Sequence, residues 1–267
     1  MISELAEFVR NLPGVYSLRR ARQKRRFFFA EQTWGLWGDY ASMSEARTHT
    51  GDPNGSSYDN DDVVDLNLDY FSRFLVFDYP VAYWLRRIIT EEAVDSLVDF
   101  GGHVGVKYYS YRDRLQLPDN FKWCVVDVAA MVRRGQQRAA ESGTTHLTFF
   151  TEVSQAPASP LLFCSGSLPY VEETIDEIIR KMVKRPRYVV INKLAVLPDR
   201  QVIALEGFGL RRIPYRVLSL VEFNSRLAAL DYEMLDSWDI PERQHSIPFV
   251  DHAKAVKSVG QVWRSRV

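Results

Sequence analysis

The stretch from Val94 to Gly105, V-D-S-L-V-D-F-G-G-H-V-G, decides the fold of this 267-residue chain. Its apolar residues end in an acid, Asp99, and a glycine-rich turn then leads into a Tyr-rich segment that can open a helix. Strand, glycine turn and helix, in this order, form nucleotide sites at the carboxyl end of the first strand in open α/β sheets. Glycines let the backbone turn tightly, and the first amides of the helix offer unpaired donors. The stretch therefore predicts a nucleotide site in such a sheet.

The spacing of the glycines indicates which nucleotide is favoured. The dinucleotide fingerprint G-x-G-x-x-G fails because His103 stands at a required glycine in one register and Phe100 in the other. An acid at the strand tip repels a pyrophosphate but attracts a cationic amine. The pattern Asp99-x-Gly101-x-x-x-Gly105 resembles the D/E-x-G-x-G-x-G motif of class I S-adenosylmethionine (SAM) methyltransferases. His103 replaces its middle glycine, with Gly102 one place early, so we expect a turn of different shape.

A second acid follows the next predicted strand. The segment F-K-W-C-V-V-D-V, starting at Phe121, ends in Asp127, and the crossover helix after it is predicted from Met131. The separation in sequence between Gly105 and Asp127 is close to the value of about 20 residues expected for a carboxylate that binds ribose hydroxyls. The alternative is an acid that only stabilises the start of the following helix. Together with Asp99, the ligand interpretation is favoured.

The rest of the chain continues an alternation of strands and helices. It predicts a doubly wound, mainly parallel, Rossmann-like α/β sheet of seven strands, closed by an antiparallel pair. Further strands are expected at 146–150, 160–164, 187–197 and 232–238, with a terminal strand pair within 253–264. Helices are expected at 66–89, 167–183 and 218–230, and a turn-rich section at 198–214.

From about Trp34 to its end, the chain is similar to a bacterial family of SAM-dependent methyltransferases found with polysaccharide-biosynthesis genes. The matching segments are Trp37-Gly38-Asp39-Tyr40, Ser44-Glu45-Ala46, Tyr58-Asp59, 99–109, 122–126 and 165–171. The resemblance implies the class I methyltransferase fold, SAM as cofactor, and O-methylation of a sugar or glycan precursor. Asn192-Lys193 departs from the family, in which an acidic or neutral residue is followed by arginine.

The resemblance also implies a set of site residues. Those expected to bind the cofactor are Tyr58, Asp99, Phe100, Gly101, Gly102, His103, Gly105, Asp127, Val128, Ser165, Gly166 and Ser167. His103 and Tyr170 are the candidate catalytic residues. His103 either acts on the acceptor or shapes the turn, and Tyr170 either contacts the acceptor or packs in the core. The other four histidines have no motif around them.

Residues 1–65 are expected to form a basic, helical extension and lid before a methyltransferase-like domain at 66–267. Residues 2–9 read as an amphipathic helix. The segment 18–29 contains six basic residues followed by three phenylalanines. Arg19 to Phe29 either contact an anionic membrane or a polyanion, or form a solvated basic face with an apolar end. The loop 51–62 carries the lid candidate Tyr58. Its acids Asp59, Asp61 and Asp62 either hold a divalent ion or act as helix dipole partners, and we predict no metal site.

Composition limits the class of protein further. Equal numbers of acidic and basic residues, 34 of each, give no overall attraction to nucleic acid. Cys124 and Cys164 are expected in strands that flank the first one, so we expect no disulfide and a cytoplasmic location. No segment is apolar enough to span a bilayer, and the N terminus does not resemble a signal peptide. Two alternative functions stay open: a non-catalytic scaffold in glycan assembly, and a nucleotide-sugar-modifying enzyme. The sequence leaves the oligomeric state open.

Overall fold

The structure is a computed structural model that describes residues 12–51, 59, 64, 68–253 and 255–266. Its chain contacts form two compact units. The larger comprises 57–201, 216–244 and 256–267, and the smaller 1–56, 202–215 and 245–255. The sequence places one boundary after residue 65, whereas in the structure two later segments also belong to the smaller unit.

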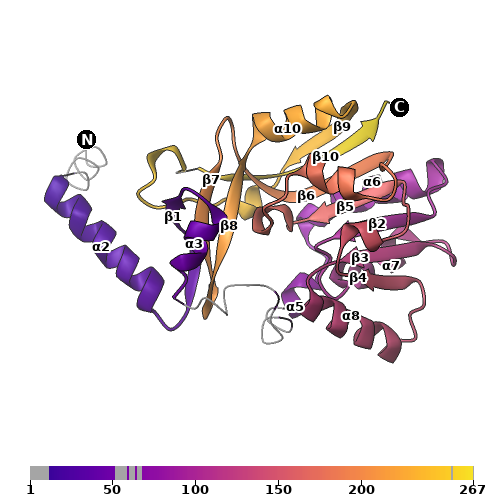
Figure 1. Ribbon diagram of the computed structural model, residues 1–267, viewed down its shortest axis with the longest axis horizontal. Coiled ribbons are helices and arrows are strands. Elements are labelled where there is room, and N and C mark those ends of the chain that lie inside the picture. Colours follow the sequence, from indigo (N-terminus) through magenta and orange to yellow (C-terminus); the bar gives the residue numbers. More distant parts are fainter. Residues whose placement is uncertain (1–11, 52–58, 60–63, 65–67, 254, 267) are drawn as a thin grey trace. The chain divides into compact units, whose positions relative to one another are not determined.

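A mainly parallel sheet forms the centre of the larger unit (Figure 1). Its strands follow the order β4-β3-β2-β5-β6-β10-β9, and the end of β8 pairs with the end of β6. Strands β2 to β6 run parallel, whereas β10 is antiparallel to both β6 and β9. The strands are β2 Ser96–Phe100, β3 Lys122–Val126, β4 Leu147–Phe150, β5 Leu161–Ser165, β6 Tyr188–Leu197, β9 Tyr232–Asp239 and β10 Lys257–Ser265. The predicted Rossmann-like α/β sheet is confirmed, and its closing antiparallel pair is β9 with β10. The expectation of a strand pair within 253–264 was wrong, because this stretch forms the single strand β10.

Helices cover both faces of this sheet. Helices α6 Tyr79–Glu91, α7 Val106–Leu115 and α8 Ala129–Glu141 share one apolar cluster with the strands. Helices α9 Ile175–Lys181 and α10 Leu220–Ala229 share the other. Within β2, Leu97 belongs to the first cluster and Val98 to the second. Burial on both faces explains why these strands read as continuous apolar runs.

Two predicted helices are each broken in the structure. The segment 66–89 forms α5 Leu68–Phe71, the 3-10 turn η1 Val76–Asp78 and then α6, which has Pro80 in its first turn. Proline lacks the N–H that a helix interior requires, so a helix must start there instead of passing through. The segment 167–183 forms η3 Leu168–Tyr170 and then α9, which Thr174 opens with a capping box.

The smaller unit contains strands from distant parts of the sequence. Strand β1 Thr33–Tyr40 pairs antiparallel with β7 Val202–Gly209, which neighbours β8 Arg211–Ser219. Helix α3 Met43–Thr48 packs on them, in a cluster of Phe27, Trp37, Met43, Ala46, Ile203 and Leu205. The prediction of turns at 198–214 was therefore wrong, because glycines at 207 and 209 resembled turn signals. Gly207 instead allows close strand pairing, since a Cβ there would lie 2.8 Å from Thr33 Cγ2.

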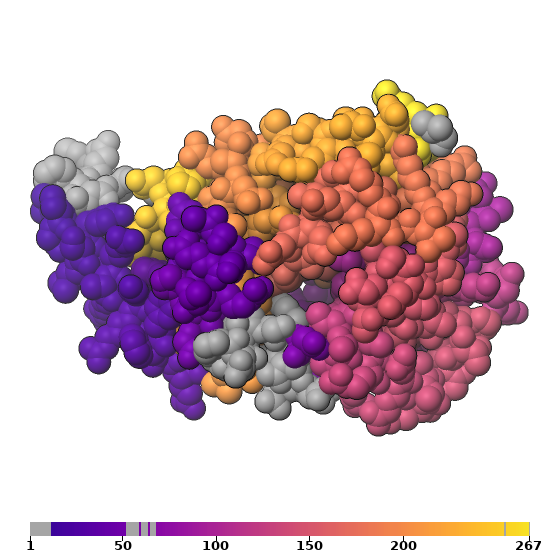
Figure 2. Space-filling model, viewed as in Figure 1, coloured from indigo at the N-terminus to yellow at the C-terminus, as the bar shows by residue number. Residues whose placement is uncertain are grey.

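The predicted basic segment lies in helix α2, Pro13–Phe29 (indigo in Figure 2). Its apolar end packs inward through Phe27, whose ring lies 6.1 Å from that of Trp37. Leu18 and Phe29 are 73% and 82% exposed, and the basic residues are exposed as well. The apolar contact of Phe27 agrees with a solvated basic face, and membrane contact stays a prediction. The predicted helix 2–9 lies outside the described residues.

Two further expectations concern redox state and membranes. Cys124 and Cys164 are buried and unbridged, on strands β3 and β5 that flank β2 as predicted. Within the part of the chain that the structure describes, none of the helices combines the length and the apolar character needed to cross a bilayer.

Candidate functional site

The glycine turn between β2 and α7 alternates left-handed residues. Gly101, His103 and Gly105 have φ of +72°, +57° and +79°, and they occupy the three glycine positions of the D-x-G-x-G-x-G pattern. His103, at the middle glycine position, adopts a left-handed conformation that glycine adopts readily, and a turn of different shape from that of the family stays a prediction. Such a conformation costs a residue with a Cβ about 1–2 kcal/mol. The His103 N–H donates to Asp127 Oδ2 at 2.7 Å, which helps to hold it.

Asp99 lies beneath this turn and is 1% exposed. Its Oδ2 accepts a 2.9 Å hydrogen bond from the buried Trp123 indole. Gly102 covers the carboxylate, since a Cβ at Gly102 would lie 2.6 Å from Oδ2. Burial raises the pKa of Asp99 to about 7, and nearby Asp127 also raises it, against the Trp123 hydrogen bond and the charges of Lys107 and Lys193. Gly102, which has no side chain, is therefore the residue of the turn that lies directly over the Asp99 carboxyl group.

Asp127 follows β3 and faces the same turn. Besides the His103 N–H, its carboxylate accepts the Val128 N–H at 2.8 Å. Burial raises the pKa of Asp127 to about 6, although both hydrogen bonds lower it. Each carboxylate oxygen has two lone pairs, so both oxygens keep one for a ligand. Asp127 is thus an acceptor held by two backbone N–H groups, with lone pairs to spare.

Asp59 joins this group from the segment that precedes α5. Its Oδ1 accepts the Ala130 N–H at 2.8 Å, at the first turn of α8, and its charge raises the pKa of Asp127. Asp59 therefore acts at the start of α8, a helix distant in sequence, whereas the dipole-partner interpretation concerned the helix that follows these acids in sequence. Tyr58, Asp61 and Asp62 lie outside the described residues. Among the residues that are described, no three His, Cys, Asp or Glu side chains gather as a metal site.

The tip of β5 packs closely on the glycine turn. Ser167 Oγ donates a 2.6 Å hydrogen bond to the carbonyl oxygen of Phe100. A Cβ on Gly101 would lie 2.1 Å from Ser167 Cβ, so only glycine fits there. Ser165 and Gly166 end the same strand and are partly buried, and Tyr170 closes η3. The structure thus brings the segment 165–167 beside the turn.

Strand β6 contributes a feature that the sequence analysis missed. Asn192 and Lys193 form a bulge opposite Gly260, where the pairing with β10 shifts register. Lys193 has φ of +57°, and its Nζ lies 3.4 Å from the position of a Cβ on Gly166. Bulges often redirect a side chain next to a functional site. The sequence departs from the family at Asn192-Lys193, but this departure alone did not indicate that the two residues form a bulge.

Beneath these strand tips lies a buried polar network around Asp78, which is 0% exposed. Its carboxylate accepts from Lys107 Nζ at 3.0 and 3.1 Å and from the Tyr111 hydroxyl at 2.6 Å. Asn192 Nδ2 lies 3.5 Å from the same carboxylate and 3.3 Å from the Phe77 carbonyl oxygen. The paired charges fix α6, α7 and β6 together under the site.

Taken together, three acids, Asp59, Asp99 and Asp127, lie around the glycine turn on the side of β2, β3 and α8. The charges of Lys107 and Lys193 also act on Asp99. This arrangement repels a pyrophosphate and suits a ligand with ribose hydroxyls and a positive charge. The side of β5 and β6 carries serine, asparagine and lysine instead. The edge therefore divides into an acidic half and a half with donors.

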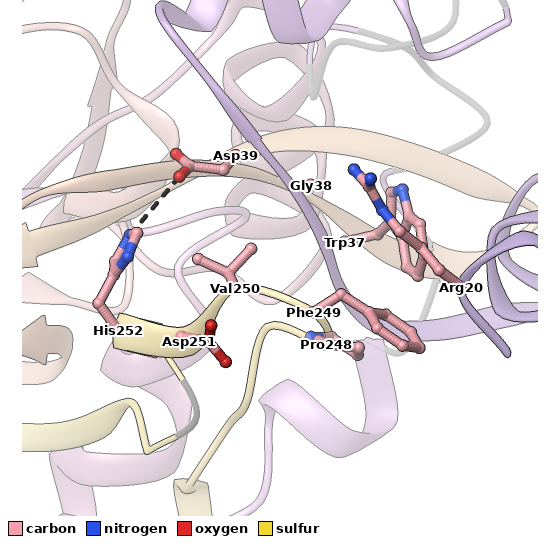
Figure 3. A pocket seen from close by; sticks show the side chains of 9 residues that line it. All are labelled: Arg20, Trp37, Gly38, Asp39, Pro248, Phe249, Val250, Asp251 and His252. Atoms are coloured by element: carbon pink, nitrogen blue, oxygen red, sulfur yellow. Dashed lines mark ion pairs between the residues drawn. The ribbon is translucent and has the colours of Figure 1, made fainter. Parts of the chain in front are cut away.

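The smaller unit has a pocket of its own, with a cavity of about 330 Å³. Figure 3 shows Asp39 and His252 pointing toward one another at one end, with Nε2 and Oδ2 3.5 Å apart. Arg20, Trp37 and Phe249 lie at the other end. None of the predicted site residues that the structure describes lines this pocket.

Comparison with known proteins gives likenesses of structure only. No family model and no curated protein matches the chain. The N-terminal domain of EvdMO1 with S-adenosylhomocysteine (SAH) bound is 12% identical, with 71% of this chain and 80% of that chain covered and a TM-score of 0.46. A SAM-dependent methyltransferase from Clostridium acetobutylicum is 10% identical, with coverage of 69% and 90% and a TM-score of 0.45. Geranyl diphosphate methyltransferase with GPP and sinefungin is 14% identical, with coverage of 71% and 78% and a TM-score of 0.48.

Proposed function

We propose that this chain is a class I SAM-dependent methyltransferase that binds its cofactor at the carboxyl edge of the larger unit's sheet. The observation that carries the proposal is the pair of acids around one glycine turn. Asp99 lies directly beneath Gly102, and Asp127 is held by the His103 and Val128 N–H groups with lone pairs to spare. A carboxylate beside the turn suits a cationic methionine group, and one at the next strand tip suits a ribose.

The residues present fit such a cofactor. In this proposal Asp127 accepts hydrogen bonds from the ribose hydroxyls, and Asp99 supplies negative charge for the amine through the gap that Gly102 leaves. When bound, SAM supplies an electrophilic methyl group on a sulfonium. The tasks of the protein are to align the acceptor with that methyl group and to take up a proton where the acceptor is a hydroxyl.

The acceptor is proposed to be a hydroxyl of a sugar or glycan precursor, which rests on the sequence resemblance described above. The half of the edge with donors, from Ser165 to Tyr170, is where such an acceptor would approach. Acceptors in open α/β folds bind outside the carboxyl ends of the strands. His103 is assigned the role of shaping the turn, because its left-handed backbone and its bond to Asp127 fix its place there.

Purified protein is expected to bind SAM and SAH with free energies on the order of −7 to −8 kcal/mol, which corresponds to micromolar dissociation constants. Calorimetry and a thermal-shift series measure both ligands directly. NAD⁺ is the matched negative control, since its pyrophosphate would meet the acids Asp99 and Asp127. The proposed function fails if neither SAM nor SAH produces heat or a shift in melting temperature.

Asp127→Asn is expected to weaken SAM binding about tenfold, because an amide offers one acceptor oxygen where a carboxylate offers two. The fold should persist, since the amide oxygen can still accept one of the two backbone N–H groups. Calorimetry on the variant and the native protein at one pH gives the comparison. An unchanged affinity would mean that Asp127 serves the backbone alone.

A further inference from the structure

Two buried polar groups with unused hydrogen-bonding capacity lie at the tips of β5 and β6, next to Lys193. Ser165 and Asn192 are register partners on these parallel strands. Ser165 Oγ and Asn192 Oδ1 are buried, and neither has a hydrogen-bond partner among the described residues. Lys193 follows Asn192, and its Nζ lies 3.4 Å from the position of a Cβ on Gly166, the residue after Ser165. Buried polar groups are nearly always paired, so such a cluster points to a ligand.

The backbone is shaped to bring Lys193 to this place. The bulge in β6 puts Lys193 in the left-handed region, which is costly for a residue with a Cβ. Gly166, also left-handed, leaves room for the lysine, since a Cβ on Gly166 would lie 3.2 Å from Lys193 Cε. The left-handed backbone at Lys193 and the missing side chain at Gly166 together give the lysine side chain its place.

We propose that Lys193 is the general base of the methyl transfer, and that Ser165 and Asn192 hold the acceptor hydroxyl against its Nζ. This inference rests on the proposed function and names the acceptor class as an alcohol. The hydroxyl proton passes to Lys193 Nζ, which becomes an ammonium. An oxygen lone pair forms the new bond to the methyl carbon. The bond from that carbon to sulfur breaks, and its electron pair stays on sulfur, so the sulfonium becomes a thioether.

The charges around Lys193 favour the neutral amine that a base requires. Burial lowers the pKa of Lys193 well below its usual range, and the charges of Lys107 on α7 and Arg243 on η4, Pro241–Arg243, lower it further. Asp78 at the start of α6 and Asp99 on β2 act in the opposite direction. Asp78 is already paired with Lys107 and Tyr111, which limits its effect on Lys193.

The first test is a titration of the lysine side chains by NMR, on the full chain with SAH bound. Protein labelled with ¹³C at lysine Cε is followed from pH 6 to pH 11, and Lys193→Arg assigns the signal of Lys193. We expect the midpoint of Lys193 to lie well below the usual range of lysine, because burial lowers its pKa. A midpoint of Lys193 within the usual lysine range would overturn the proposal. The titration decides the matter whether or not an acceptor has been found.

The second test measures SAH formation from SAM with a panel of monosaccharides and oligosaccharides as acceptors. Lys193→Met is expected to lower turnover about 10²–10⁴-fold, the range for loss of a general base. Lys193→Arg should be equally impaired, because arginine stays charged and cannot accept the proton. Lys122→Arg is the matched control and should keep the native rate and pH profile.

The outcomes separate this inference from the proposed function. Loss of turnover in both Lys193 variants with retained SAH binding supports the base. Full turnover in Lys193→Arg means that only a positive charge is needed there, as for an anionic acceptor, and overturns it. Absence of SAM and SAH binding in the native protein contradicts the proposed function itself, whereas retained binding with full turnover in Lys193→Arg contradicts the base alone.

Discussion

Gly101→Ala is expected to destabilise the protein by about 2–5 kcal/mol and to lower its affinity for SAM at least about tenfold. The left-handed backbone at φ +72° accounts for about 1–2 kcal/mol of the lost stability. The rest comes from overpacking, because the new Cβ would lie 2.1 Å from Ser167 Cβ. Relief of this clash must separate the tips of β2 and β5, which would move the turn away from Asp127.

Gly143→Ala is the matched control for this substitution. Gly143 has φ of +63°, but a Cβ there meets nothing within 4 Å. It should therefore lose only the backbone contribution, about 1 kcal/mol, which shifts the melting temperature by about 2–4 °C. Thermal melts and SAM titrations of both variants give the comparison. Equal melting temperatures for the two would show that the tips of β2 and β5 are not as tightly packed as described.

Asp99→Asn is expected to have opposite effects on stability and on binding. The folded-state pKa of about 7 lies above the ordinary value of 3.8 for an aspartic acid, so folding favours the protonated acid. The protonated Asp99 therefore adds to the free energy of unfolding below pH 4, and this contribution is lost as the pH rises through about 7. An amide does not ionise and can still accept the Trp123 hydrogen bond. The variant should therefore melt above the native protein at pH 8, by a margin that shrinks toward pH 5.

SAM binding should weaken about 100-fold in the same variant at pH 8, because the charge that attracts the cationic ligand is gone. Below pH 7 the native affinity should fall toward that of Asp99→Asn, since protonation of Asp99 removes the same charge. Comparison of the two proteins at each pH cancels the titration of the ligand. Asp113→Asn, on an 85% exposed side chain, is the control for a surface charge. A constant ratio of affinities from pH 6 to pH 8.5 would refute the role of Asp99.

The elements that the sequence predicted well are those whose signal is local. Strand β2, its glycine turn and the acid after β3 could be located because the spacing from Gly105 to Asp127 is a property of one crossover. The terminal antiparallel pair followed from strands without a strong helix between them. Each of these inferences needs only neighbouring residues and the rules of α/β sheets.

What the sequence could not predict depends on contacts between distant residues. Strand β1, T-W-G-L-W-G-D-Y, contains two glycines, and its partner β7 is encoded near the other end of the chain. Asp59 caps α8 rather than the helix that follows it in sequence. The bulge at Lys193 appears only once β10 pairs with β6. None of these has a periodic pattern, because each is decided by tertiary packing.

The pairing of β1 with β7 also bears on the order in which the chain is made and folded. Thr33 pairs with Gly209, so these two residues emerge from a ribosome roughly ten seconds or more apart at about 5–20 residues per second. During that interval Trp37 and Leu36, buried in the finished protein, have no strand to cover them. Strand β1 would then reach its final structure only after β7 has been made. Nascent chains of this protein should depend on chaperones that shield β1 until β7 has been translated.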